Sequence, residues 1–190
     1  LGTLPYGEAL QAMRELTAGR TEATADEIWV VEHPPVYTLG QGATSALKQD
    51  LGIPVVASDR GGEITYHGPG QAVLYTLVDL ARRRITVKRF VWLLEQAVID
   101  LVGRRAVRHP GAPGVYVAGA KLAALGIRVK RGRAYHGLAL NVDMDLAPFG
   151  AIDPCGYPGL AVTQLRDLKV ETSGAGDRLA HILVQLLDHA

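Results

Sequence analysis

One cysteine stands out among the residues that could do chemistry. Cys155 is the only thiol in this chain of 190 residues, and it lies between Pro154 and Gly156 in a segment of turn-forming residues. A thiolate is a good nucleophile, although an unperturbed thiol is mostly protonated at neutral pH. A free cysteine is more often a small buried hydrophobe than a nucleophile. A position in a loop favours the reactive interpretation, and the residue alone leaves both open.

A lysine in an apolar segment is the second candidate. Lys121 is the only charged residue between His109 and Arg128 when histidine is counted as neutral. Lysines are seldom buried without a partner, so this side chain could hold a functional ammonium against an anion. The alternative is a lysine at a strand end whose ammonium extends into solvent.

Residues 60–71 have the composition of a ligand-binding loop. Their sequence, RGGEITYHGPGQ, contains four glycines, one arginine and one histidine. Glycines let the backbone approach a ligand closely, and free N–H groups there can hold an anionic or carbonyl oxygen. A glycine-rich hairpin with an incidental histidine is the alternative, so the segment predicts a ligand site only together with the other two.

Several other site types are excluded. The sequence has no GxxxxGK[ST] loop, no HExxH helix, no GxSxG elbow and no paired CxxC, and its six histidines do not fall at metal-ligand spacing. We therefore expect no metal. A lone cysteine excludes an internal disulfide and favours a reducing compartment. The longest uncharged stretches are shorter than the ~18 apolar residues of a membrane span, and residues 1–14 do not resemble a signal peptide, so we expect a soluble cytoplasmic protein.

Charge is distributed unevenly along the chain. Residues 82–133 contain 13 lysines and arginines against only Glu95 and Asp100, whereas the net charge of the whole chain is +1. A basic middle segment could receive an acidic partner. Ordinary solvated faces that are adjacent only in sequence are the alternative.

Short β-rich runs and three helices are expected to position these residues. Helical spacing of apolar residues predicts helices near 10–19, from an N-cap at Thr86 to Gly103, and near 179–187. The predicted strands are 28–32, 36–39, 55–57, 72–80, 114–117, 126–129 and 135–142. Many strands follow one another with no helix between them, and no repeat or linker divides the chain. We expect one α/β (α+β) domain, residues 1–190, with a mixed or antiparallel sheet and helices packed on it.

Together these segments resemble the lipoyl(octanoyl) transferases of lipoate biosynthesis. The matching stretches are RGGEITYHGPGQ at 60–71, PGVYVAGAKLAALGIRV at 113–129, HGLALNVDMDL at 136–146 and PCG at 154–156. The run EHPPVYTLG at 32–40 is also similar, whereas the two ends of the chain match less distinctively. The segments come in the family's order, which is more specific than any one motif.

The resemblance implies a fold like the biotin/lipoate protein ligase catalytic domain, and an acyltransferase that needs no cofactor. Such an enzyme moves an octanoyl group from octanoyl-acyl carrier protein to a lysine of a lipoyl domain, the first step of endogenous protein lipoylation. The implied acceptors are the lipoyl domains of 2-oxoacid dehydrogenase complexes and the glycine cleavage H protein, with no nucleic acid and no membrane as partner.

The resemblance also implies the site residues. Cys155 would be the nucleophile that carries the acyl group as a thioester, and Lys121 its partner, which stabilises the thiolate and acts as general acid and base. Backbone N–H groups near Gly61 or Leu138 are candidates for holding the oxyanion. The implied substrate-binding residues are Arg60, Gly61, Gly62, Glu63, Ile64, Thr65, Tyr66, His67, Ala124, Leu125, Gly126, Gly137, Leu138 and Ala139.

Two other functions remain open at this point. An ATP-dependent lipoate or biotin protein ligase would share the fold but needs no cysteine nucleophile. A non-catalytic module that binds a carrier protein belongs to another class. The Cys155 and Lys121 motifs favour the transferase over both.

Overall fold

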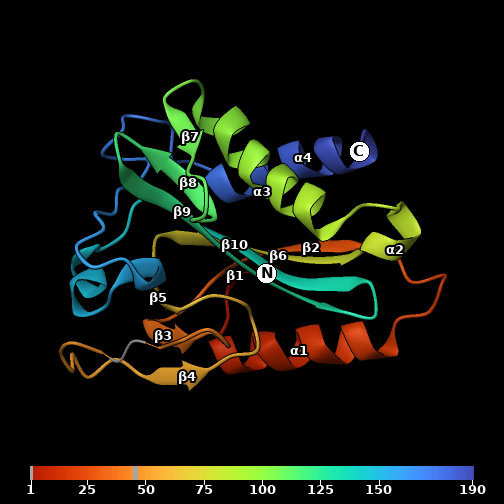
Figure 1. Ribbon diagram of the computed structural model, residues 1–190, viewed down its shortest axis with the longest axis horizontal. Helices are drawn as coiled ribbons and strands as arrows, with labels where there is room; N and C mark the ends of the chain where they lie inside the picture. Colours follow the sequence, from red (N-terminus) through yellow and green to blue (C-terminus); the bar gives the residue numbers. More distant parts are fainter. Residues whose placement is uncertain (1, 45–46) are drawn as a thin grey trace.

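A seven-stranded mixed sheet runs through the centre of the computed structural model, which describes residues 2–44 and 47–190 and, at Cys155, the backbone only (Figure 1). The strands β1 and β2 are parallel, and every other pair of neighbours is antiparallel. In spatial order the strands are β1 (Gly2–Thr3), β2 (Glu27–Glu32), β6 (Gln71–Asp79), β10 (Arg133–Asn141), β9 (Ala120–Lys130), β8 (Gly114–Val117) and β7 (Ala106–Arg108).

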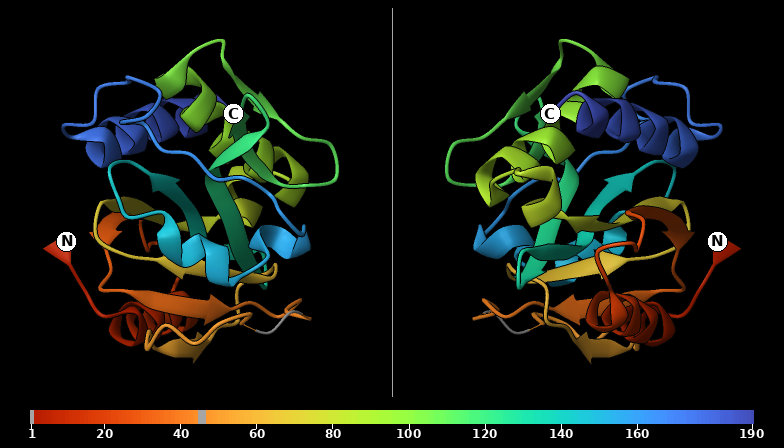
Figure 2. Two further views of the ribbon diagram at one scale, coloured as in Figure 1. Left: turned by 90° about the vertical axis from the view of Figure 1, so that its left-hand side faces the viewer. Right: turned by 90° about the vertical axis from the view of Figure 1, so that its right-hand side faces the viewer.

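Helices cover both faces of this sheet. Helix α1 (Tyr6–Gly19) packs on one face, and α3 (Val87–Val102) and α4 (Ala175–Asp188) pack on the other (Figure 2). The short helix α2 (Leu80–Arg83) follows β6 directly. Helix α3 begins where the Thr86 hydroxyl accepts a hydrogen bond from the N–H of Arg89, and it ends at Gly103, whose φ of 88° is easily adopted only by glycine.

A second, three-stranded sheet lies beside α1. Its order is β4 (Val55–Ala57), β3 (Val36–Leu39) and β5 (Ile64–His67). Behind it, Tyr37, Tyr66 and Phe149 form a separate core with the 3₁₀ turn η1 (Ala147–Ala151). The 3₁₀ turn η2 (Pro154–Gly156) follows and contains the cysteine.

The expected mixed sheet with packed helices is confirmed, and the three predicted helices are present. The sequence patterns miss β1, β5 and β7, and they begin β9 six residues too late. Residues 120–125 are mostly alanine and leucine, which have little strand preference of their own. They are extended because β10 pairs with β9 on one side and β8 pairs with its beginning on the other.

Candidate active site

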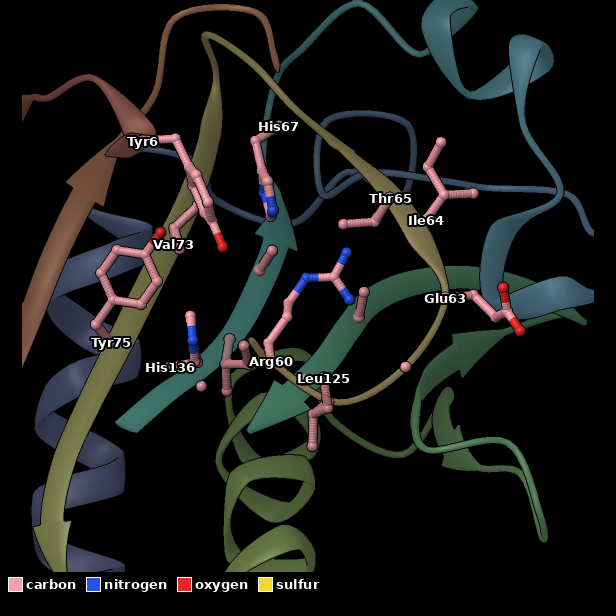
Figure 3. Close-up of a pocket in the computed structure, with 16 residues that line it drawn as sticks. Tyr6, Arg60, Glu63, Ile64, Thr65, His67, Val73, Tyr75, Leu125 and His136 are labelled. Atoms are coloured by element: carbon pink, nitrogen blue, oxygen red, sulfur yellow. The ribbon is translucent and has the colours of Figure 1, made fainter. Parts of the chain in front are cut away.

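A pocket opens between the α1 face of the large sheet and the chain from Arg60 to His67 (Figure 3). It encloses about 530 Å³, including its open mouth. Its lining residues are Tyr6, Arg60, Gly62, Glu63, Ile64, Thr65, His67, Val73, Tyr75, Ala124, Leu125, Gly126, His136, Gly137, Leu138 and Ala139. We call this space the acyl pocket.

Small residues form the floor of the acyl pocket. Ala124 lies directly opposite Ala139 in the pairing of β9 with β10, and Gly126 lies opposite Gly137. Alternate residues of a strand point to the same face, so all four present a methyl group or a hydrogen toward the pocket. The sheet therefore leaves room above these four positions.

Arg60 lines the pocket on the side of strand β3. Its guanidinium donates hydrogen bonds to the Thr38 carbonyl at 2.7 Å, to the Thr38 hydroxyl at 2.8 Å and to the Gly61 carbonyl at 3.0 Å. The loop after β3 fits closely here, since a Cβ at Gly40 would lie 2.0 Å from the Gly62 carbonyl oxygen. Arg60 is thus fixed by β3 rather than extended into solvent.

Aromatic polar groups gather on one side of the pocket. Figure 3 shows Tyr6, Tyr75, His67 and His136 there, with Glu63 and Thr65 across from them. His33, which is buried behind them, bonds through Nε2 to the Tyr75 hydroxyl at 2.6 Å. These groups come from four distant segments, and together they give the pocket one polar wall.

Burial keeps the histidines of this wall neutral. It lowers the pKa of His67 to about 3, with the nearby Arg60 charge acting in the same direction. Burial also lowers the pKa of His136 to about 4, although the hydrogen bond to Asp59 at 2.7 Å opposes the shift. The pKa of Asp59 falls to about 2 despite its own burial, because His136, Tyr135 and Arg14 all donate hydrogen bonds to it. At neutral pH the wall therefore holds uncharged imidazoles around one fixed carboxylate.

Lys121 is buried near the beginning of β9, with only 3% of its surface exposed. Its ammonium donates to the Pro113 carbonyl at 3.2 Å and lies 5.3 Å from the centre of the Tyr116 ring. Glycine is required at position 114, where φ is 145° and a Cβ would lie 2.8 Å from the Ala123 carbonyl oxygen as well as 2.7 Å from the Lys121 Cε. The interpretation of Lys121 as a solvent-extended lysine is therefore wrong.

The chain that follows the PCG motif runs beside Lys121. The Lys121 N–H donates to the Ala161 carbonyl at 2.8 Å, and the Thr163 N–H donates to the Lys121 carbonyl at 2.9 Å. A small cavity next to these bonds is lined by Lys121 and by Pro154, the residue before the cysteine. Thr65 and Ala124 line both this cavity and the acyl pocket, so the two spaces adjoin.

A buried hydrogen-bonded chain links the acyl pocket to this region. His67 bonds to the Gln71 Oε1 at 2.7 Å, and the Gln71 amide donates to the Asn141 Oδ1 at 3.0 Å. Asn141 in turn donates to the Thr163 carbonyl at 3.0 Å. Because the Gln71 oxygen accepts, His67 carries its proton on Nδ1. The chain holds residues 161–163 against β9.

Cys155 lies in the turn η2, and its side chain is outside the part of the chain that the structure describes. The Gly156 N–H donates to the Asp153 carbonyl at 2.9 Å, which closes the turn. A Cβ at Gly156 would lie 3.3 Å from the Glu63 Cγ, so the turn packs against the rim of the acyl pocket. The backbone of the predicted nucleophile is therefore next to the segment 60–67.

Most of the predicted binding residues come together around one space. All fourteen line the acyl pocket except Gly61 and Tyr66. Tyr66 points from the opposite face of β5 into the second core. Gly61 lies on the outer side of the segment, where its N–H donates to the Ile127 carbonyl at 3.0 Å and is not available to an oxyanion. Whether the lining residues bind substrate stays a prediction.

Four lining residues were not predicted: Tyr6, Val73, Tyr75 and His136. His136 begins a recognised motif, but its role depends on Asp59, which no local pattern connects to it. The other three come from α1 and β6, whose spacing indicates only core packing. Among residues 2–44 and 47–190, no cluster of three or more histidine, acidic or cysteine side chains could hold a metal ion. In the same part of the chain, no helix has both the length and the apolarity of a membrane span.

Comparisons with known proteins identify the family of the chain. A family model for the lipoyl protein ligase A/B catalytic domain matches residues 5–181. An octanoyltransferase of Dechloromonas aromatica (strain RCB) is 55% identical over 194 residues, covering 99% of this chain and 95% of that protein. An octanoyltransferase of Thiobacillus denitrificans (strain ATCC 25259 / T1) is 60% identical over 177 residues, covering 91% of this chain and 81% of that protein.

Solved structures share the fold. A bipartite lipoate protein ligase from Thermoplasma acidophilum is similar with a TM-score of 0.71 and 15% identity, over 98% of this chain and 80% of that chain. Lipoate-protein ligase A bound with ATP is similar with a TM-score of 0.64 and 13% identity, over 98% of this chain and 82% of that chain. At such identities the likeness concerns the fold alone, and it confirms the expected ligase-like architecture. The chain belongs to the lipoyl protein ligase A/B catalytic-domain family and, within it, to the octanoyltransferases.

Proposed function

We propose that this protein transfers an octanoyl group from an acyl carrier protein to a lysine of a lipoyl domain, through a thioester on Cys155. One observation carries the proposal. The buried Lys121 and the residue before Cys155 line one cavity, and that cavity adjoins the acyl pocket. The names of the relatives support octanoyl transfer as the reaction.

The acyl pocket is proposed to hold the octanoyl chain. Its floor of alanines and glycines leaves space, and the Val73 side chain adds apolar lining. Burial of an alkyl chain is favourable by about 0.8 kcal/mol for each methylene removed from water. The polar wall at Tyr75 and His67 would then face the end or the side of the chain rather than the reacting carbonyl.

The first half-reaction loads the enzyme. The Cys155 thiolate attacks the thioester carbonyl of the donor, a new carbon–sulfur bond forms, and the carrier's sulfur leaves as a thiolate that takes a proton from water. The Lys121 ammonium favours the thiolate, because two opposite charges ~4 Å apart attract by about 4 kcal/mol at an effective dielectric near 20, before desolvation is subtracted. No nucleotide is needed, since the donor is already activated.

The second half-reaction transfers the octanoyl group from Cys155 to the acceptor lysine. The amine of the acceptor lysine attacks the acyl-Cys155 carbonyl, a carbon–nitrogen bond forms, and Cys155 leaves as a thiolate. Once the thiolate has been consumed by acylation, the charge that held the proton on Lys121 is gone. Lys121 then releases its proton to water and, as a neutral amine, serves as the base that takes the proton lost by the attacking amine. The proposed acceptors are the lipoyl domains of 2-oxoacid dehydrogenase complexes and the glycine cleavage H protein.

Intact-protein mass spectrometry tests this proposal. After incubation with octanoyl-carrier protein and no ATP, the wild-type chain should gain one octanoyl group that neutral hydroxylamine removes, and Cys155→Ser should gain none. Because the chain has one thiol, no other residue can form the thioester. An adduct that persists in Cys155→Ser, or a strict requirement for ATP, contradicts the proposal, the latter in favour of a ligase.

A further inference from the structure

A second groove lies on the other side of the segment 61–63. It is lined by Gly61, Gly62, Glu63, Val91, Gly111, Ala112, Pro113, Leu125, Gly126, Ile127 and Tyr157. Most of the side chains in this lining are apolar. Four of its residues, Gly62, Glu63, Leu125 and Gly126, also line the acyl pocket, so the two spaces share a wall. We call this space the outer groove.

The inner end of the outer groove is at the proposed reacting centre. Pro113 lines it, and the Pro113 carbonyl accepts the hydrogen bond of the Lys121 ammonium. Tyr157 also lines it, two residues after Cys155. A chain lying in the groove would therefore reach the site from the side opposite the acyl pocket.

One wall of the outer groove is the edge of β9 beyond the end of its pairing with β8. Strand β8 pairs with β9 only as far as Ala124, and in the described chain no strand continues beside the residues that follow it. The Ile127 carbonyl faces this edge, because it accepts the N–H of Gly61. In an antiparallel strand alternate residues direct their backbone groups to the same side, so Leu125 also directs its N–H and C=O toward the groove. An extended chain that contains amides can pair with such an edge.

The outer end of the groove meets a basic and aromatic surface. Val91 lines the groove, and the next residue, Trp92, is 37% exposed. The Arg89 guanidinium lies 4.4 Å from the centre of the Trp92 ring, and the Arg108 guanidinium lies 4.6 Å from it on β7. Lys88 is exposed beside Arg89 on the same helix. This surface carries positive charge where a partner would enter.

We propose that the outer groove receives the phosphopantetheine arm of the acyl donor, and that Lys88, Arg89 and Trp92 seat the acidic carrier protein at its outer end. The inference rests on the proposed function, because it concerns the donor of that reaction. The arm is an extended chain with two amides, which suits the open edge of β9, and a phosphate at its protein end, which suits the basic surface. It ends in the thioester sulfur, which would lie between Pro113 and Tyr157.

The rest of the basic segment is less suited to this role. Arg82 and Arg83 form ion pairs with Asp26, and Arg133 forms one with Asp79. Arg131 lies ten residues beyond Lys121, about 33 Å at the usual rise of a strand. An extended arm of fourteen bonds spans only about 17 Å at roughly 1.2 Å per bond. The hairpin turn at Arg131 is therefore too far from the site to hold the attached end of the arm.

Three octanoyl donors separate the parts of this proposal: octanoyl-carrier protein, octanoyl-pantetheine and the octanoyl thioester of 2-mercaptoethanol, which has no amide. Val91→Trp narrows the groove and should raise KM about tenfold for the first two donors, with the third unchanged. Arg89→Glu should raise KM for the carrier protein alone, and added salt should weaken that donor for the wild type. The matched charge reversal Arg131→Glu should change none of them.

A second variant tests the groove independently in case Val91→Trp does not fold. Tyr157 is 47% exposed, so Tyr157→Ala can be made with little effect on the core, and it should raise KM for the carrier and pantetheine donors several-fold. If Val91→Trp and Tyr157→Ala change KM equally for all three donors, or for none of them, the groove assignment is wrong. The proposed function would still stand in that case, provided that Cys155 is loaded. If no donor loads the wild-type enzyme, the proposed function itself fails.

Discussion

A lysine buried beside a polar backbone group is the residue on which the proposed chemistry depends. Lys121 is held in place by the Pro113 carbonyl and by the face of Tyr116 before any substrate arrives. A preorganised charge needs little rearrangement when the reaction begins, which makes it more effective than one that must be ordered first. The position of Lys121, rather than its charge alone, is therefore the property that substitutions should test.

Substitution of Lys121 should separate the two half-reactions. Lys121→Ala should slow alkylation of Cys155 at neutral pH by about tenfold, with a smaller effect at high pH where the thiol ionises unaided. Lys121→Arg keeps the charge but cannot release its proton, so it should load the octanoyl group yet transfer it poorly. Rapid-quench measurement of loading and of transfer checks both results. Transfer by Lys121→Arg at the wild-type rate would show that Lys121 is not the base.

Local sequence patterns predict some residues of the site and not others. Lys121 was visible because a lone charge in an apolar segment is rare, and the small residues of β9 and β10 fell inside recognisable motifs. Tyr6 and Tyr75 lie outside those motifs and join the site only through tertiary contacts, and His136 lies in a motif that gives no sign of its hydrogen bond to the distant Asp59. Residues whose role depends on folding partners leave no local signal.

At the scale of elements, the site is built on two neighbouring strands whose pairing aligns small residues. Sequence patterns predicted β10 within two residues but only the second half of β9, because its first half is extended by pairing and not by its own preference. That first half carries Lys121 and Ala124. A segment that the sequence patterns did not predict as a strand is thus the one that places the proposed base against the floor of the acyl pocket.

The floor should set the length of the acyl chain. Ala139→Val adds two methyl groups above a strand position that tolerates a branched residue, so the fold should lose no more than about 1–3 kcal/mol. The added volume occupies the acyl pocket, and kcat/KM for octanoyl transfer should fall about tenfold relative to butyryl transfer. Competition between the two acyl donors measures the ratio. An unchanged ratio would place the alkyl chain elsewhere.

At the scale of the whole molecule, the polar wall of the pocket is also part of the core. His67 and His136 are both at most 5% exposed, and both lie between α1 and the large sheet. A protein that keeps such groups neutral inside gives up stability when the unfolded chain can bind protons that the folded chain cannot. The site therefore makes the stability of the fold sensitive to pH.

Stability should fall as the pH drops from neutral toward 5. The pKa values of His67 and His136, about 3 and about 4, lie below the ordinary 6.5, so the unfolded chain takes up protons first. Each histidine lowers the free energy of unfolding by about 1.4 kcal/mol for each pH unit below 6.5. Together, His67 and His136 should therefore lower it by about 3 kcal/mol at pH 5.5. Asp59, with its pKa lowered to about 2, adds a further loss only below pH 4.

Urea unfolding at pH 7.5 and pH 5.5 checks this expectation. The free energy of unfolding of the wild type should fall by at least about 3 kcal/mol between the two pH values, because burial also lowers the pKa of His33. The fall for His67→Gln, which has no imidazole at that position, should be about 1.4 kcal/mol smaller. A wild-type protein equally stable at both pH values would mean that these histidines are protonated in the folded state.

Transfer from the isolated acyl-enzyme shows whether the Cys155 thioester is the reaction intermediate. The enzyme is loaded with octanoyl-carrier protein, separated from the donor, and mixed with an excess of unmodified lipoyl domain in the absence of ATP. The octanoyl mass should leave Cys155 and appear on the lipoyl domain as a hydroxylamine-resistant amide, one for one, within the turnover time of the steady-state reaction. An acyl-enzyme that keeps its octanoyl group, or that loses it only to water, would contradict the account, because the thioester would then be a side product and not the intermediate.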